Sequence, residues 1–447
     1  MLYNYLTSFK KSRFYNVMIF GIIMRLLIMP FTSHPFDVYS WYSIMNALMI
    51  EGIDMNFILS SLRPLWIFTL VIISYIYNGL LFFINVGITP INQLPNLYNP
   101  YYDVPFITDI LFNFIVKFPM LLSDIGSTAV LYYLVKEYAG QSKAELIPSL
   151  YFLNPVLIWI SAVWGQYESI IVFFTLLSIY YILKKKILLS SICLLTASLY
   201  KYYALIVIIP IFLYLKKNDF YNLFKYMAIF IVSIIFLVII GKNQLINSFM
   251  SSHFIVYLFS ENTFHGLFGY GLTYWSLSLI FNNIPYILFT IPLILMFSFL
   301  IISLYSLVKS EMKFGLLKIS LSTFLLMSSI FLSHRYIGET RYIFLVPFLI
   351  IMVIWEVIPV KYYYAITTIA FIYSIKTLPY FFLPLVSLNN NIFKVLFLLI
   401  VPFKVTVDNV IIPSKLGGLI LGLLGTLFSF IILKICIVSI RKLLIIK

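Results

Sequence analysis

Long apolar segments constrain this chain more than any other feature of its sequence. Runs of about 15 to 25 mostly apolar residues recur from end to end, and a helix of that length crosses the hydrocarbon core of a bilayer. In total, 62% of the residues are hydrophobic and 10% are charged, against roughly 25% charged residues in an average soluble domain. Short alternating strands, which a transmembrane barrel needs, are not found. The sequence therefore predicts an all-α polytopic membrane protein.

The net charge of +15 reports membrane topology rather than nucleic-acid binding. Basic residues gather in short clusters between apolar runs, and clusters in alternate loops are typical of cytoplasmic loops. These clusters are Lys10–Arg13, Lys136–Lys143, Lys184–Lys186, Lys216–Lys225, Lys309–Lys318, Lys361 and Lys434–Lys447. The two cysteines, Cys193 and Cys436, lie far apart in apolar runs. They predict neither a disulfide framework nor a metal-binding pair.

The alternation of basic clusters predicts about twelve spans in one domain, residues 1–447, with both ends cytoplasmic. The outer segments are 33–106, 242–285 and 376–412. Pro64–Val86 is apolar enough to span but no basic cluster follows it, so we expect an interfacial or re-entrant hairpin on the outer side. Leu188–Lys216 is long and has basic clusters at both ends. We expect two short helices there, folded back at Lys201 and Tyr202.

Asp37 is the strongest candidate for catalysis in a chain with only 15 acidic residues. It follows the first span, which ends through Pro30 and a Thr-Ser-His-Pro turn. The aromatic segment after it has the pattern of a helix in the membrane interface. We expect Asp37 to be a catalytic base, with His34 and Trp41 beside it to bind substrate. The alternative is that Asp37 only caps the helix that follows.

Polar residues in apolar runs are informative because each costs several kcal/mol unless it is paired or solvated. Asp124 lies about two turns after Lys117 on one predicted helix. It is either an accessory binding residue or a polar clasp to a neighbouring helix. Gln166 and Glu168 follow a helix break at Asn154-Pro155. They are candidates for binding sugar hydroxyls, and the alternative is a polar turn between helices.

Several basic residues on the predicted outer side are candidates for binding an anionic substrate. Lys201, with Tyr202 beside it, lies on the outer side although most lysines are predicted to be cytoplasmic. The alternative to substrate binding is that its side chain extends to the lipid headgroups. His265 lies in the glycine-rich and aromatic loop 261–275, which could close over a substrate or be a surface turn. A guanidinium binds phosphate with two parallel hydrogen bonds, so a late cluster is a candidate phosphate clamp or, alternatively, an interfacial anchor. Its members are His334, Arg335 and Arg341.

The order of these motifs resembles the GT-C superfamily of integral-membrane glycosyltransferases. The similarity is to the dolichyl-phosphate-glucose-dependent glucosyltransferases and the related mannosyltransferases of N-glycan assembly. It covers most of the chain up to about Pro347. The residues that carry it are HPFDVYSWY, KFPMLLSD, NPVLIWISAVWGQYE, SLYKYYALIVIIP, HGLFGYGLTYW and HRYIGETRY. Arg63-Pro64-Leu65 resembles the start of a loop helix in that family, whereas Glu168 stands where Asn or Asp is commoner.

What the resemblance implies is inverting transfer of a hexose from a polyprenyl- or dolichyl-phosphate sugar. The acceptor would be a lipid-linked or protein-linked glycan on the outer or lumenal face of a plasma or endoplasmic-reticulum membrane. Asp37 would be the general base, and His334 would lie near the donor phosphate. Such a transfer needs a base at the acceptor hydroxyl and cations on the leaving phosphate. It needs no nucleotide and no nucleic acid, and a divalent metal ion is compatible with it but not firmly implied.

A different class of protein also fits part of the pattern. A polytopic transporter or a flippase for a lipid-linked oligosaccharide would have many spans and functional charges. It would carry those charges near the bilayer midplane and show internal repeats. Here the polar residues fall on one predicted side and no repeat is visible in the sequence. The sequence therefore favours the transferase.

Overall fold

The computed structural model describes most of the chain. The described residues are 13–50, 52, 63–84, 91–92, 106–107, 109–232, 315–333, 339–374, 404–407, 410–413 and 415–445, with a few single positions between 235 and 305. They are almost entirely helical, as predicted, apart from two short antiparallel strand pairs. The outer segments predicted at 242–285 and 376–412 fall largely outside these residues, and so do His265, His334 and Arg335.

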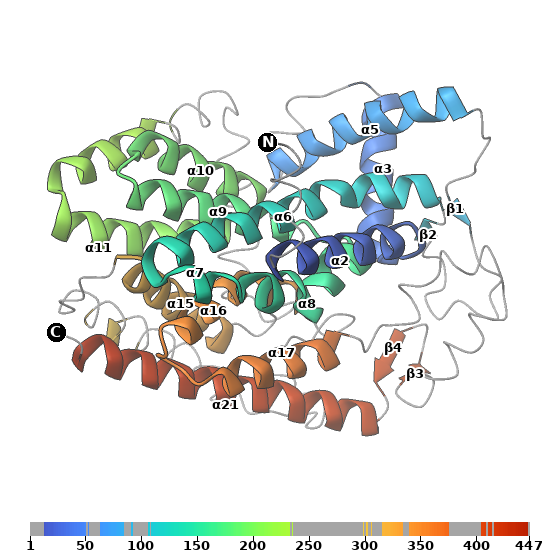
Figure 1. Ribbon diagram of the computed structural model, residues 1–447. Coiled ribbons are helices and arrows are strands. Elements are labelled where there is room, and N and C mark those ends of the chain that lie inside the picture. Colours follow the sequence, from blue (N-terminus) through green and yellow to red (C-terminus); the bar gives the residue numbers. More distant parts are fainter. Residues whose placement is uncertain are drawn as a thin grey trace.

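The first half of the chain forms a bundle of helices with several short breaks (Figure 1). Its elements are α2 (Arg13–Ile28), η1 (Met29–Phe31), α3 (Pro35–Ile50), α5 (Pro64–Ile84), β1 (Ile91–Asn92), β2 (Phe106–Ile107), α6 (Ile110–Ala139), α7 (Gln141–Ala144), η2 (Pro148–Phe152), α8 (Pro155–Ile158), η3 (Trp159–Trp164), α9 (Glu168–Leu183), α10 (Ile187–Tyr200), η4 (Tyr202–Val207) and α11 (Ile208–Asn218). In β1 and β2, Ile91 pairs with Ile107 and Asn92 with Phe106.

The described part of the second half packs along one side of this bundle, and α17 and α21 lie side by side there (Figure 1). Its elements are α15 (Gly315–Ser333), η6 (Glu339–Phe344), α16 (Val346–Ile354), α17 (Val360–Ser374), β3 (Lys404–Val407), β4 (Val410–Pro413) and α21 (Lys415–Ile445). Strands β3 and β4 form an antiparallel pair in which Val407 opposes Val410.

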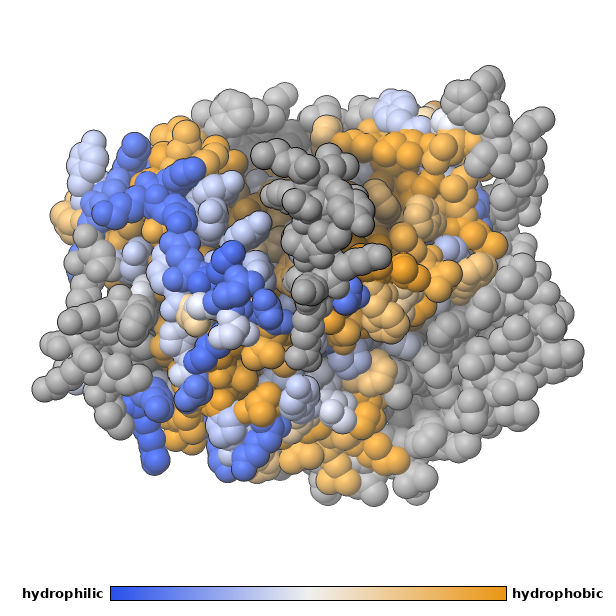
Figure 2. Space-filling view, viewed as in Figure 1, coloured by the Kyte–Doolittle hydropathy of each residue, from blue (hydrophilic) through white to orange (hydrophobic). Residues whose placement is uncertain are grey.

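Four helices among the described residues are long and apolar enough to cross a membrane, and a fifth crossing is obtained if one bent pair counts as a span. The four are Phe14–Phe31, Pro64–Leu81, Ile110–Ala139 and Gly422–Lys442, and the bent pair joins Gln141–Phe152 to Pro155–Trp164. Large apolar side chains also remain exposed on these helices, Leu27 at 66% and Phe68 at 49% among them. Such a surface suits lipid rather than water, and Figure 2 shows it over α5. The chain is therefore a membrane protein.

Two predicted breaks are present where the sequence places them. The bent pair breaks at Asn154, whose side-chain oxygen accepts hydrogen bonds from the N–H groups of Val156 and Leu157 and so caps α8. Pro155 follows at the first helical position, where its missing N–H costs nothing. The second break is at Lys201, which is extended between α10 and η4. Both breaks turn the chain toward the polar site described below.

One local prediction was wrong. Instead of a hairpin over Pro64–Val86, the structure has a single unbroken 21-residue helix, α5. Its interior contains no proline, and its one glycine, Gly79, does not interrupt the hydrogen-bonded turns. Its apolar residues are numerous enough to keep the helix continuous, while the charge pattern that suggested a hairpin carries no information on local backbone geometry.

Candidate active site

Asp37 lies in the first turn of α3, which begins at Pro35. One face of this helix is buried, with Val38, Trp41, Met45 and Leu48 spaced as one side of a helix requires. This face packs against α5 and fixes the start of α3 relative to the bundle. Trp41 is only 2% exposed and makes edge-to-face contact with Trp66, with ring centroids 4.9 Å apart. We therefore correct its predicted role, because it packs under the site and is closed to substrate.

The Asp37 carboxylate is held through one of its two oxygens. Oδ2 accepts a hydrogen bond from Trp164 Nε1 at 2.6 Å and another from Gln166 Nε2 at 2.5 Å. His34 Nδ1 lies 3.2 Å from the same oxygen and accepts the Asp37 backbone N–H at 3.1 Å. The His34 ring also stacks on Trp164, with centroids 4.5 Å apart and planes 9° apart. These contacts fix the direction in which the carboxylate points.

The other oxygen of Asp37, Oδ1, receives no hydrogen bond from any residue that the structure describes. The side chain remains 29% exposed, so this oxygen is open to a ligand. Burial alone raises the pKa of Asp37, but the electrostatic effect of the neighbouring His34 ring and the hydrogen bonds from Trp164 and Gln166 outweigh it, with a smaller effect from Lys201. The pKa of Asp37 is therefore held below its ordinary value of 3.8. Asp37 is an ionised, oriented carboxylate with one accessible oxygen.

A tight turn delivers Trp164 and Gln166 to Asp37. The π-helical segment η3 ends at Gly165, whose φ of +88° lies in the left-handed region that favours glycine. A Cβ at this position would lie 3.0 Å from the Lys117 side chain, so the turn is also close-packed. Both requirements explain why the Trp-Gly-Gln sequence forms this turn.

Lys117 is a buried lysine behind the site. Its Nζ donates to the backbone oxygens of Met29 at 3.1 Å and Val163 at 3.1 Å, to the backbone oxygen of Thr32, and to Thr32 Oγ1 at 2.9 Å. Within the described ranges it forms no ion pair with a carboxylate. Thr32 leads into the turn before Asp37, and Val163 directly precedes Trp164. Lys117 therefore fastens together the two segments that build the Asp37 site.

Glu168 and Lys201 form a second group of polar contacts at the same end of the bundle. The 16 residues of α9 lead away from Glu168, and the 14 residues of α10 lead back, so Lys201 returns to the start of α9. Lys201 Nζ donates to Glu168 Oε1, and Thr340 Oγ1 donates to the same oxygen at 3.1 Å. Glu168 is fully buried whereas Lys201 is 17% exposed. Glu168 thus positions Lys201 and does not itself face a ligand.

Three cations surround this end of the bundle. Lys201 Nζ lies 4.7 Å from the centroid of the Tyr167 ring, and the Arg63 guanidinium lies 6.0 Å from it. Arg63 is also attracted by Asp37 and Glu168. Arg341, in η6, is close enough to Lys201 to repel its charge. In the part of the chain that the structure describes, the two nearby carboxylates carry fewer charges than the three cations, and this positive balance favours an anionic ligand.

Asp124 belongs to a separate buried clasp. Its Oδ2 accepts a hydrogen bond from Arg25 Nε at 3.2 Å and one from Ser161 Oγ at 2.7 Å. Both Arg25 and Asp124 are 0% exposed, and Arg25 also donates to the backbone oxygen of Phe152 at 2.7 Å. The clasp joins α2 to α6 and to the bent pair. We therefore correct the assignment of Asp124 to substrate binding, in favour of the alternative that it is a clasp between helices.

The structure brings together most of the site predicted from the sequence. His34, Gln166, Glu168 and Lys201 lie around Asp37, with Arg341 nearby, and Tyr202 follows Lys201 as the first residue of η4. Gln166 and Glu168 hold other site residues rather than facing a sugar. Sequence reasoning missed the indole N–H of Trp164, the hydroxyl of Thr340 and the charge of Arg63. In the described part of the chain, no three His, Cys, Asp or Glu side chains gather as a metal cage.

Comparison with known proteins does not assign this chain to a family. No family model matches the chain, and the curated proteins include no significant match.

Proposed function

We propose that this protein is a membrane hexosyltransferase of the GT-C type. It transfers glucose or mannose, with inversion, from a polyprenyl- or dolichyl-phosphate sugar to a hydroxyl of a lipid-linked or protein-linked glycan. In this proposal the chain has a GT-C-like fold of about twelve spans with its site on the outer or lumenal face. Asp37 is the general base.

The observation that carries this proposal is the state of the Asp37 carboxylate. Trp164 and Gln166 donate to Oδ2, while Oδ1 accepts no hydrogen bond from a described residue and the side chain is 29% exposed. A carboxylate that served only to cap α3 would use its oxygen on an N–H group of that helix, and Asp37 instead accepts from side chains of another segment. An oriented, ionised, accessible carboxylate is what a general base requires.

The chemistry follows from this arrangement. Asp37 Oδ1 accepts the proton of the acceptor hydroxyl as that oxygen forms a bond to the anomeric carbon. The bond from that carbon to the phosphate oxygen breaks on the opposite face, so the configuration inverts. The leaving phosphate takes the bonding electron pair, and its negative charge needs cations. Among the described residues, Lys201, Arg63 and Arg341 are cations near this site.

The position of the basic clusters supports an outer site. Glu168 and Lys184 stand at the two ends of α9, about 24 Å apart along a helix of this length. Lys184 pairs with Glu137 at 2.7 Å at the end of the bundle where α6 also finishes. If that end is cytoplasmic, as its lysines indicate, the Asp37 site lies on the outer side.

Sugar transfer by the purified protein in liposomes tests the proposal. The donors are polyprenyl-phosphate glucose and polyprenyl-phosphate mannose, each with a lipid-linked glycan acceptor, and the products are separated by mass. We expect a product one hexose heavier than the acceptor with one of the donors. If neither donor gives product while the same liposomes translocate a lipid-linked glycan, the proposal is wrong and the protein is a flippase.

A further inference from the structure

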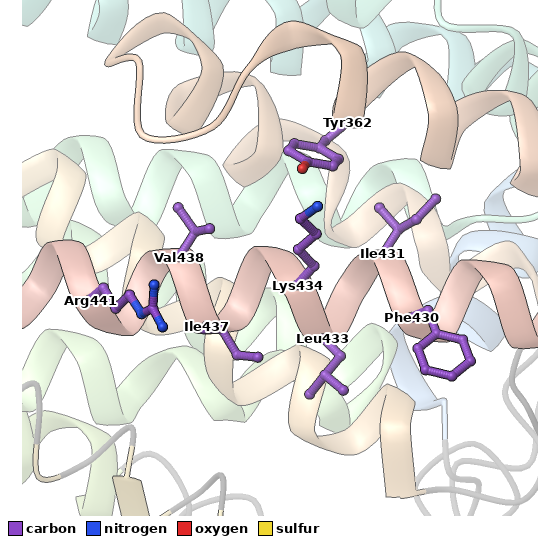
Figure 3. A pocket seen from close by; sticks show the side chains of 8 residues that line it. All are labelled: Tyr362, Phe430, Ile431, Leu433, Lys434, Ile437, Val438 and Arg441. Carbon is purple, nitrogen blue, oxygen red and sulfur yellow. The ribbon is translucent and has the colours of Figure 1, made fainter.

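A groove of about 500 Å³ lies between α17 and α21, on another side of the molecule from the residues that hold Asp37. Figure 3 shows its lining, in which Tyr362 of α17 faces a stripe of α21. The α21 residues are Phe430, Ile431, Leu433, Lys434, Ile437, Val438 and Arg441. The groove therefore runs along a helix that is itself long and apolar enough to cross a membrane.

Two cations project from the α21 side of this groove. Lys434 lies inside the apolar stretch Gly422–Lys442, and its side chain is exposed. Arg441 follows seven residues later, which is two helical turns on the same face and about 10 Å along the axis, and it is also exposed. In the described residues neither side chain forms an ion pair with a carboxylate. A lysine within a lipid-facing span is costly unless it has a partner.

The Tyr362 ring lies close to two lysines at the groove. Lys434 Nζ lies 5.3 Å from the centroid of its ring, and Lys361 Nζ lies 5.9 Å from the same ring. A cation–π contact at an exposed site is weak and does not offset the cost of a charge facing hydrocarbon. Two cations, Lys434 and Arg441, therefore line the groove, and a third, Lys361, lies at the Tyr362 ring.

The rest of the groove is apolar and exposed. Phe430 is 65% exposed and Ile437 is 43% exposed, seven residues apart on the same face of α21 as the cations. Leu433 lies between them and is partly exposed. Apolar side chains therefore continue from the cations toward the middle of the span, in the direction that a lipid chain runs from its headgroup.

We propose that this groove binds one anionic phospholipid. The headgroup phosphate lies between Lys434 and Arg441, and one acyl chain follows Leu433 and Phe430 toward the middle of the span. A guanidinium binds phosphate oxygens with two parallel bonds, and basic pockets between membrane helices bind anionic headgroups in this way. The lipid belongs to the leaflet on the side of the α21 C-terminus, and its binding does not depend on sugar transfer.

Native mass spectrometry of the purified full-length protein tests this proposal. The protein in detergent receives equal amounts of phosphatidylglycerol and phosphatidylcholine, and the retained lipid is counted for each variant. We expect the wild type to retain phosphatidylglycerol preferentially, and the variant with Lys434→Gln and Arg441→Gln to retain about tenfold less. Lys216→Gln, which removes an exposed lysine from α11, should retain as much as the wild type.

Two further measurements separate binding of the headgroup phosphate from binding of the acyl chain, and they show whether a loss of binding comes from misfolding. If the apolar residues of the groove contact an acyl chain, inorganic phosphate should not displace phosphatidylglycerol. Displacement by millimolar phosphate would show that the acyl chain contributes nothing to binding. Leu433→Trp fills the groove without changing the charge and should also reduce retention. Equal retention of the two lipids by the wild type, or unchanged retention in Leu433→Trp and in a folded double variant, would overturn the proposal.

Discussion

Two carboxylates contact the same short segment of the chain and yet have different surroundings. Ser161 donates to Asp124 Oδ2, while Trp164 and Gln166, a few residues later, donate to Asp37 Oδ2. Asp124 is 0% exposed and paired with Arg25. Asp37 is 29% exposed and has an open Oδ1. The same means of orienting an aspartate therefore gives a closed clasp at one place and an accessible carboxylate at the other.

The difference teaches that hydrogen bonding alone does not mark a functional acid. Both aspartates accept two side-chain hydrogen bonds on one oxygen, from Arg25 and Ser161 for Asp124 and from Trp164 and Gln166 for Asp37. Access to one oxygen is what separates them. If this comparison is right, removing Asp124 should affect folding most, and removing Asp37 should affect chemistry most.

The largest stability effect is expected for Asp124→Ala. This change leaves the Arg25 guanidinium buried without its charge partner, which costs about 3–5 kcal/mol of unfolding free energy. Thermal unfolding in detergent measures it. Glu137→Gln is the matched control, since it breaks the partly exposed pair with Lys184 and should cost less than about 1 kcal/mol. Equal losses in the two variants would contradict the clasp.

Lys117→Met is expected to lower both stability and catalysis, with a smaller loss of stability than Asp124→Ala. The lost hydrogen bonds cost about 1–3 kcal/mol of unfolding free energy in total, because removing the buried amine also removes its own desolvation cost. The segments carrying Asp37 and Trp164 also lose their common anchor. We expect a lower melting temperature together with a lower kcat, while the KM for donor changes little. Lys143→Met removes a lysine that bonds the Ile354 backbone oxygen near the basic end of the bundle. A fall in kcat for that control as large as for Lys117→Met would show that the anchor is not specific.

The smallest effect is expected for Trp164→Phe, which removes one hydrogen bond from Asp37 and keeps an aromatic ring against His34. Because the bond from Trp164 lowers the pKa of Asp37, its loss raises that pKa toward the ordinary value. The base works only when ionised, so the acid limb of kcat/KM should move to higher pH. The profile is measured with the transfer assay. A limb that moves to lower pH, or stays in place, would contradict the role of the indole.

Much of the helical pattern follows from the sequence. The helix break at Asn154-Pro155 was predicted, and the break at Lys201 followed from basic clusters at both ends of a long apolar run. These predictions work because a membrane makes every charged residue informative about position. The unbroken α5 was missed because the argument for a hairpin rested on charge alone.

The candidate site was predictable only in part. Asp37, Gln166 and Lys201 stood out because polar residues are rare in this chain. Their partners did not, because the indole N–H of Trp164 and the hydroxyl of Thr340 come from residue types that usually pack or face solvent. Asp124 was ambiguous for a related reason: its partner Arg25 is 99 positions away, and burial of that pair depends on how three helices meet.

The rate of hexose transfer by Asp37→Asn, per folded protein, tests the central claim most directly. The change keeps the shape of the side chain. It replaces one carboxylate oxygen by an NH2 group and so removes the base. We predict that transfer falls by about 100-fold or more while the melting temperature stays within a few degrees of the wild-type value. A folded Asp37→Asn protein that transfers hexose at the wild-type rate would contradict the assignment of Asp37 as the base.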